Sequence, residues 1–213
     1  TSIINYVGLL QQENLPPQTI QEYVGVLDRQ STRLKKLTDD LFEVSKASTG
    51  SLAVDMAPAD AGVLLAQTAG EYSERLEKLG LELVLHQPDE PVMILADGRH
   101  LWRIFDNLLN NICKYAQPAT RVYLSLDANG REASITFRNI SREPLNLSGE
   151  ELIERFVRGD ASRNTEGSGL GLAIASSLAE LMKASMTLSV DGDLFKVVLV
   201  FSQLKSERTP ATP

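Results

Sequence analysis

Apolar residues recur at helical spacing in the first fifty positions of the chain. Residues 1–13 carry them three or four positions apart, which predicts a helix with one apolar face. Pro16 and Pro17 should end this helix, because neither can continue it. The same spacing resumes over residues 19–46 and predicts a second, longer helix.

The second predicted helix has an apolar stripe close to the a/d seam of a heptad repeat. The seam comprises Ile20, Tyr23, Leu27, Leu34, Leu37, Leu41 and Val44, with Gln30 as its polar member. The two helices together predict a hairpin whose seam has to be buried. A partner chain is one way to cover it, and the rest of this chain is the other.

The pattern changes after Ser48-Thr49-Gly50, which indicates a hinge. Beyond it, stretches with helical spacing and stretches that alternate between apolar and polar residues follow one another. Asp60 is placed to cap the first of these helices. The predicted helices span 60–78, 99–116, 150–157 and 170–182. The predicted strands span 81–86, 92–95, 121–126, 133–138, 186–190 and 194–201, and the last four form two hairpins. The polar segment 159–168 is predicted to be a loop. These elements predict an α+β fold, a mixed sheet with helices on one face.

Composition narrows the class of protein. The chain has 213 residues, of which 43% are hydrophobic, so a substantial core can form. A formal net charge of −7 argues against nucleic acid or anionic lipid as a partner, because both attract basic surfaces. The single cysteine, Cys113, excludes an internal disulfide and favours a reducing compartment. No apolar run approaches the roughly 20 residues that a membrane span needs.

Three asparagines gather in the predicted helix 99–116. Asn107 and Asn111 are four positions apart and therefore share one face of the helix. Asparagine is a poor interior helix residue, and its amide oxygen suits Mg²⁺. Lys114, one turn further on, adds a charge suited to phosphate. The stretch indicates a metal and phosphate site or, alternatively, a solvated helix face with chance asparagines.

A glycine-rich stretch opens the last predicted helix. Gly167, Gly169 and Gly171 would let the backbone approach a ligand closely, and a helix N-terminus offers free N–H groups to phosphate. The stretch lacks the preceding βαβ strand of a Rossmann motif and the Gly-Lys-Ser/Thr of a Walker A loop. Taken alone, it is a weak signal that fits an ordinary glycine-rich loop better than a phosphate site.

A third stretch runs from Glu151 to Asp160, just before the polar loop. It places Phe156 ahead of that loop, with Arg158 and Arg163 nearby. This arrangement suits a lid over a polyphosphate, and it also fits an ordinary surface helix and linker.

Together the three stretches resemble the N, F and G2 boxes of sensor histidine kinases, within the larger GHKL ATPase family. The boxes read Asn-x-x-x-Asn-x-x-Lys-Tyr, Arg/Glu-x-Phe-x-Arg-Gly-Asp and Gly-x-Gly-Leu-Gly-Leu, and their order and spacing agree. The resemblance implies a two-layer α/β sandwich of the GHKL (Bergerat) type behind a helical hairpin. Residues 1–50 would be a partial dimerisation and histidine-phosphotransfer hairpin, 51–204 the catalytic ATP-binding domain and 205–213 a tail.

The resemblance also implies ATP and Mg²⁺ as ligands and a role for individual residues. Asn111 should ligate the Mg²⁺ ion that bridges the phosphates, with Asn107 beside it. Lys114 should reach a phosphate, and Tyr115 should line the nucleotide pocket. The other residues expected to bind the nucleotide are Asn139, Phe156, Arg158, Arg163, Gly167, Gly169, Leu170 and Gly171.

One departure from the family concerns the G1 box, Asp-x-Gly-x-Gly, where this chain has Asn139-Ile140-Ser141-Arg142-Glu143. In the family, the aspartate accepts a hydrogen bond from the adenine amino group. Asn139 could accept the same bond through its amide oxygen. A neutral bond is weaker than a charge-assisted one by ~1 kcal/mol, so we expect reduced ATP affinity.

A second departure concerns the H box, His-Glu/Asp-Leu-Lys/Arg-Thr-Pro-Leu, which should precede Thr1. The two histidines, His86 and His100, lie in a predicted strand and a predicted helix outside the hairpin. Neither is therefore expected to accept phosphate. The phosphoaccepting histidine is expected upstream of Thr1, so we expect this stretch of chain not to autophosphorylate.

The implied reaction is transfer of the ATP γ-phosphoryl group to a histidine and then to an aspartate of a response regulator. The resemblance also implies a homodimer through the hairpin and a cytoplasmic fragment of a sensor anchored in the membrane by N-terminal segments. The alternative is a degenerate nucleotide-binding domain that acts as a dimeric scaffold or switch. The altered G1 box favours that alternative, and the three intact boxes oppose it. A chaperone or topoisomerase type of ATPase fits the hairpin less well.

Overall fold

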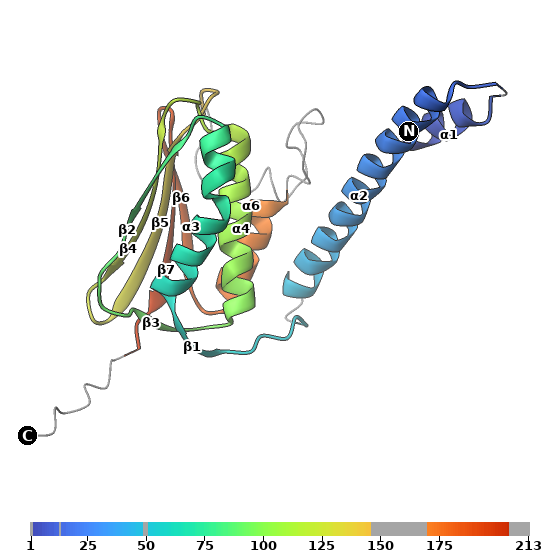
Figure 1. Ribbon diagram of the computed structural model, residues 1–213. Helices are drawn as coiled ribbons and strands as arrows, with labels where there is room; N and C mark the ends of the chain where they lie inside the picture. Colours follow the sequence, from blue (N-terminus) through green and yellow to red (C-terminus); the bar gives the residue numbers. More distant parts are fainter. Residues whose placement is uncertain (1, 13, 49–50, 146–169, 205–213) are drawn as a thin grey trace, which may run out of the picture.

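A helical hairpin stands beside a two-layer α/β domain in the computed structural model of this protein (Figure 1). The structure describes residues 2–12, 14–48, 51–145 and 170–204. The predicted helix 150–157 and the predicted loop 159–168 lie outside these ranges. Among the helices that are described, none is long and apolar enough to cross a membrane.

The hairpin consists of α1 (Ser2–Leu10) and α2 (Pro17–Ser48). The two helices meet at Tyr6 and Tyr23, whose rings pack edge-on with centroids 5.3 Å apart. Helix α2 begins at Pro17, two residues before the predicted start at residue 19. Proline suits the first position of a helix, because its fixed φ is already helical and its missing N–H would have no partner there.

Five strands form the main sheet in the order β2-β4-β5-β7-β6. Their bounds are β2 (Glu82–His86), β4 (Arg121–Ala128), β5 (Glu132–Ile140), β7 (Leu194–Ser202) and β6 (Ser185–Asp191). The pair β2–β4 is parallel and the other three pairs are antiparallel, which confirms the predicted mixed sheet. Both predicted hairpins, β4–β5 and β6–β7, are present.

Three helices cover one face of this sheet (Figure 1). They are α3 (Ala61–Lys78), α4 (Gly98–Tyr115) and α6 (Gly171–Leu181). Asp60 caps α3 as predicted, since its carboxylate accepts hydrogen bonds from the N–H groups of Gly62 and Val63. Alternate residues of β5 and β7 point into the core, where Phe137 packs against Phe105 of α4 with ring centroids 5.6 Å apart.

One strand was missed by the sequence analysis. β1 (Ala57–Asp60) pairs antiparallel with β3 (Met93–Ala96) in a separate two-stranded ribbon. The sequence of β1, Ala-Pro-Ala-Asp, has none of the β-branched or aromatic residues that favour strands. Pairing with β3 therefore decides its conformation.

Candidate nucleotide-binding site

Helix α4 carries the asparagines that the sequence analysis singled out. The carboxylate of Asp97 caps the helix by accepting from the N–H groups of Arg99 and His100 at 2.9 and 3.3 Å. Burial acts to raise the pKa of Asp97, but backbone N–H donors from Asp55, His100 and Arg99 outweigh it and hold the pKa below its ordinary value. The ionised cap fixes the start of α4 and thereby the position of its later turns.

The predicted site residues of α4 lie along the boundary between core and solvent. Asn107 is buried with 8% of its surface exposed, Asn111 and Tyr115 are partly exposed, and Lys114 is exposed. The side-chain nitrogen Nδ2 of Asn107 has no hydrogen-bond partner. A buried amide donor with no partner is unusual in a folded protein. Asn107 is therefore suited to meet an acceptor from outside the protein.

The start of α6 lies against Asn107. A Cβ atom placed on Gly171 would come within 3.3 Å of the Asn107 amide oxygen, closer than most such contacts. The absence of a side chain at Gly171 thus leaves room for Asn107. Two stretches that lie far apart in the sequence, the asparagine helix and the glycine-rich helix start, meet here as the predicted site requires.

The end of β5 supplies the third part of the site. Asn139 is buried with 3% exposed, on the face of β5 that points toward the helices. Its Nδ2 donates to the carbonyl of Ile140 at 3.1 Å, and its Oδ1 has no partner. This bond to a carbonyl orients the amide so that the oxygen stays available as an acceptor. The strand runs to Ile140, two residues past its predicted end, so Asn139 belongs to the sheet.

Backbone contacts hold this strand end beside the end of α4. The N–H of Arg142 donates to the carbonyl of Tyr115 at 2.8 Å, and that of Gln117 donates to the carbonyl of Ile140 at 2.8 Å. Ala116 and Ser141 form an isolated antiparallel bridge between them. These contacts place Asn139 near the turn of α4 that carries Tyr115.

Buried side-chain atoms that lack a hydrogen-bond partner indicate whether these residues fit a nucleotide. In the described part of the chain, the buried side-chain atoms without a partner are Asn107 Nδ2, Arg138 Nε and Asn139 Oδ1. An unsatisfied buried group costs about 1–3 kcal/mol, so such groups are rare without a reason. A donor that could meet a phosphate oxygen and an acceptor that could meet an amino group fit the two ends of an adenine nucleotide.

The ligands that this candidate site offers to a metal ion are amide oxygens. Within the described ranges, no three His, Cys, Asp or Glu side chains come together as a metal-binding group. Mg²⁺ commonly takes few protein ligands and shares the rest of its shell with water and phosphate. The amide oxygen of Asn111 is compatible with that mode.

Five predicted site residues and the adjoining lid lie outside the described residues. They are Phe156, Arg158, Arg163, Gly167 and Gly169. Leu170, directly before α6, is described and packs against the hydrophobic core.

A residue that the sequence analysis missed ties α3 to α4. Tyr72 is buried, and its hydroxyl donates to the carboxylate of Asp106 at 2.5 Å. Burial first, and the hydrogen bond to Asp106 second, raise the pKa of Tyr72 well above its ordinary value. Nothing in the local sequence around Tyr72 indicates this partner, which lies 34 positions along the chain.

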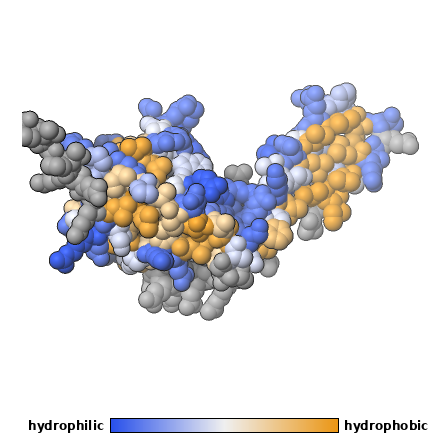
Figure 2. All heavy atoms as spheres, turned by 90° about the horizontal axis from the view of Figure 1, so that it is seen from below, coloured by the Kyte–Doolittle hydropathy of each residue, from blue (hydrophilic) through white to orange (hydrophobic). Residues whose placement is uncertain are grey.

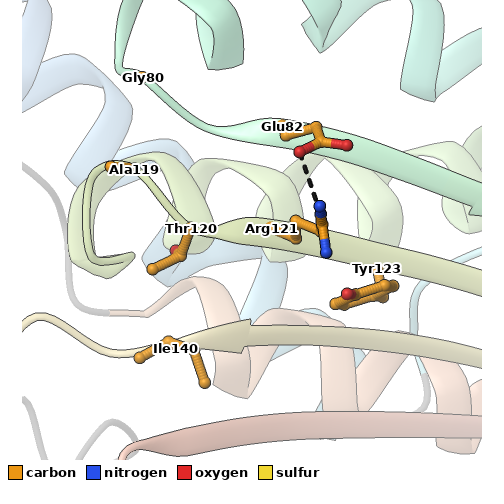
Figure 3. Close-up of a pocket in the computed structure, with 7 residues that line it drawn as sticks. All are labelled: Gly80, Glu82, Ala119, Thr120, Arg121, Tyr123 and Ile140. Atoms are coloured by element: carbon orange, nitrogen blue, oxygen red, sulfur yellow. Dashed lines mark hydrogen bonds and ion pairs between the residues drawn. The ribbon is translucent and has the colours of Figure 1, made fainter.

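A separate pocket of about 530 Å³ opens on the opposite face of the sheet (Figure 3). Its lining comprises Gly80, Glu82, Ala119, Thr120, Arg121, Tyr123 and Ile140. The guanidinium of Arg121 is bound to Glu82 at 3.0 Å, which compensates its charge. The pocket contains none of the predicted site residues, so it is separate from the candidate site around Asn107, Asn139 and Gly171.

Comparisons with known proteins agree with the geometry. Residues 96–205 match the family described as histidine kinase-, DNA gyrase B-, and HSP90-like ATPase. The chain is 34% identical over 161 residues to the signal transduction histidine-protein kinase BaeS of Escherichia coli K12, covering 75% of this chain and 34% of BaeS. It spans about a third to a half of the length of the curated relatives it matches first.

Solved structures share the fold over nearly the whole chain. Full-length ShkA in complex with AMPPNP matches with a TM-score of 0.74 and 24% identity, over 96% of this chain and 43% of ShkA. The histidine kinase ThkA in complex with the response regulator protein TrrA matches with a TM-score of 0.71 and 14% identity, over 97% of this chain and 58% of ThkA.

The chain belongs to the family of histidine kinase-, DNA gyrase B- and HSP90-like ATPases. Within it, the domain that follows the hairpin is the catalytic domain of a sensor histidine kinase. The predicted family and fold class are thereby confirmed.

Proposed function

We propose that α4, the end of β5 and the start of α6 bind Mg²⁺·ATP. The observation that carries the proposal is the pair of orphaned amide atoms, Asn107 Nδ2 and Asn139 Oδ1. Asn107 donates to a phosphate oxygen, and Asn139 accepts from the adenine amino group. Asn111 supplies an oxygen ligand to the metal, and Lys114 adds positive charge for the phosphates.

In the whole protein, the proposed reaction moves the γ-phosphoryl group of ATP to a histidine and then to an aspartate of a response regulator. Mg²⁺ supplies charge neutralisation at the phosphates when it is bound. The part of this chain is to orient the nucleotide through Asn107 and Asn139. Response-regulator binding is supported by the fold shared with ThkA, whose structure contains such a partner.

A homodimer through the hairpin is also proposed. Apolar side chains of α1 and α2 remain on the surface, and Figure 2 shows them gathered on the hairpin. The most exposed are Ile4, Val24, Leu34, Leu41 and Phe42, with 75%, 51%, 55%, 60% and 61% of their surface exposed. A second copy would remove this surface from water.

The second candidate function is a nucleotide-independent scaffold, and Asn139 is the observation that favours it. A neutral amide stands where the family has the aspartate that contacts the adenine base. The affinity for nucleotide would then be too low to support kinase activity. The intact asparagine helix and the Gly171 contact favour the catalytic domain over the scaffold.

Calorimetric titration with a non-hydrolysable ATP analogue, with and without Mg²⁺, tests the proposal. We expect magnesium-dependent binding that Asn111→Ala abolishes. Asn110→Ala is the matched control, because Asn110 lies on the same helix but accepts from Arg75 of α3 at 2.8 Å. Binding that is lost equally in both variants, or absent at millimolar analogue, would refute the site and leave the scaffold function.

A further inference from the structure

Two cations stand side by side on the face of the sheet opposite to α3, α4 and α6. The register pairs Arg138 of β5 directly with Lys196 of β7. Side chains alternate along a strand, and Asn139 points toward the helices, so Arg138 points to this opposite face. Lys196 shares the face, because its neighbours Phe195 and Val197 are buried in the core. Like charges directly opposite each other destabilise an antiparallel pair, so the arrangement favours an anion that binds between them.

The charge of this pair is not compensated by the domain. Within the described ranges, neither Arg138 nor Lys196 forms an ion pair, whereas Arg121 on the neighbouring strand is paired with Glu82 at 3.0 Å. The guanidinium of Arg138 lies over the ring of Tyr123, 5.4 Å from its centroid, which holds the group in place but leaves its charge. Its Nε atom is buried, and no described residue accepts its hydrogen. A buried donor without a partner is costly, so this N–H is suited to an acceptor from outside the protein.

The pocket of Figure 3 adjoins the two cations. Tyr123 lies opposite Arg138 in the register of β4 and β5, and Ile140 is the next residue of β5 on the same face. Both line the pocket, and they give it an aromatic and an aliphatic wall. Its volume of about 530 Å³ lies within the roughly 300–1,000 Å³ of small-molecule sites. The apolar walls and the neighbouring cations together fit a molecule with an apolar body and an anionic group.

We propose that this pocket binds a small organic acid. Its carboxylate lies between Arg138 and Lys196, and its apolar body packs on Tyr123 and Ile140. The net charge of −7 opposes an acidic protein partner, which would be repelled over a large area, whereas a single carboxylate meets only the local positive charge. The site is distinct from the candidate nucleotide site, because Asn139 points to the other face of β5.

Calorimetric titration with 1-naphthoate, a two-ring aromatic carboxylate, tests the site, and 1-naphthamide is the matched ligand of the same shape without the charge. We expect saturable binding of 1-naphthoate and roughly tenfold weaker binding of the amide, which forms no charge-assisted bond. Arg138→Gln should weaken the binding of 1-naphthoate roughly tenfold. Lys196→Gln should weaken it roughly threefold, because a lysine ammonium is a flexible, strongly hydrated charge. Arg131→Gln is the control variant and should leave it unchanged, since Arg131 is an exposed arginine beyond the other end of β5.

Thermal unfolding supplies a second measurement. At equal concentration, 1-naphthoate should raise the midpoint of the parent and of Arg131→Gln more than that of Arg138→Gln. If Arg138→Gln does not fold, Lys196→Gln decides the test, because Lys196 forms no hydrogen bond or ion pair in the part of the chain that the structure describes.

Absence of saturable binding at millimolar 1-naphthoate overturns the proposal. Equal affinity for the amide, unchanged affinity in Lys196→Gln, or an equal loss in Arg131→Gln overturns it as well. So does displacement of 1-naphthoate by the non-hydrolysable ATP analogue, since the acid would then occupy the nucleotide site. The titration contains no nucleotide in its other arms, so failure of the proposed ATP site leaves their outcome unaffected.

Discussion

We predict that the side chain of Asn139 lowers the stability of the domain without nucleotide and strengthens nucleotide binding. Replacing it with valine removes the orphaned Oδ1, a group whose burial without a partner costs about 1–3 kcal/mol. The change also removes the bond from Nδ2 to the carbonyl of Ile140, worth about 0.5–1.5 kcal/mol. That carbonyl keeps the N–H of Gln117 as a donor at 2.8 Å, so it is not left unsatisfied. Valine also suits a central strand better than asparagine does.

The balance predicts that Asn139→Val raises the free energy of unfolding by about 1 kcal/mol, or the midpoint of thermal unfolding by about 2–4 °C for a domain of this size. The same variant should bind the ATP analogue roughly fivefold more weakly, because one hydrogen bond worth about 1 kcal/mol is lost. Urea unfolding followed by the fluorescence of Trp102, the single tryptophan, measures the first effect. Calorimetry measures the second.

Thr136→Val is the control, because Thr136 lies on the same strand but on the opposite face. It should leave nucleotide affinity unchanged. A loss of stability in Asn139→Val would show that the amide is satisfied in the empty domain. Unchanged affinity would show that its oxygen does not meet the nucleotide. Either result refutes the assignment of Asn139 as the base acceptor.

Three further predictions follow from single contacts. Asn139→Asp should bind the ATP analogue roughly fivefold more tightly in calorimetry, since a carboxylate forms a charge-assisted bond, and unchanged affinity would count against the weakened-base hypothesis. Asp97→Asn should lower the free energy of unfolding at pH 7 by about 1–2 kcal/mol through weaker bonds to three N–H donors. Because the pKa of Asp97 is depressed in the folded state, the stability that its carboxylate contributes is complete above the unfolded pKa of about 4 and is lost as the pH falls through the lower folded pKa. In urea unfolding, the free energies of the variant and the parent should therefore converge in acid. A difference that stays constant with pH contradicts this prediction. Lys183→Gly should stabilise the domain by about 1 kcal/mol, since Lys183 follows α6 with φ of 59°, and Lys183→Ala, which keeps the Cβ strain, should give no such gain in thermal unfolding.

Periodicity and short motifs in the sequence predicted most of the secondary structure. Strands β5 and β7 and helix α4 could be predicted because their apolar side chains recur at the period of a strand or a helix. The asparagine and glycine stretches were readable for a similar reason, since the residue types are unusual for their positions. β1 has no residue that favours a strand, so only its pairing with β3 decides its conformation.

The tertiary structure decided which of these stretches act together. That Asn107 lies against Gly171, 64 positions away, depends on the packing of α4 on α6 over the sheet, and no local pattern encodes that distance. The same holds for Arg138 and Lys196, which look like ordinary surface charges until β5 is placed beside β7. Local chemistry fixes which side chains a segment can offer, whereas contacts between distant segments are set by how the apolar faces of the whole chain bury one another.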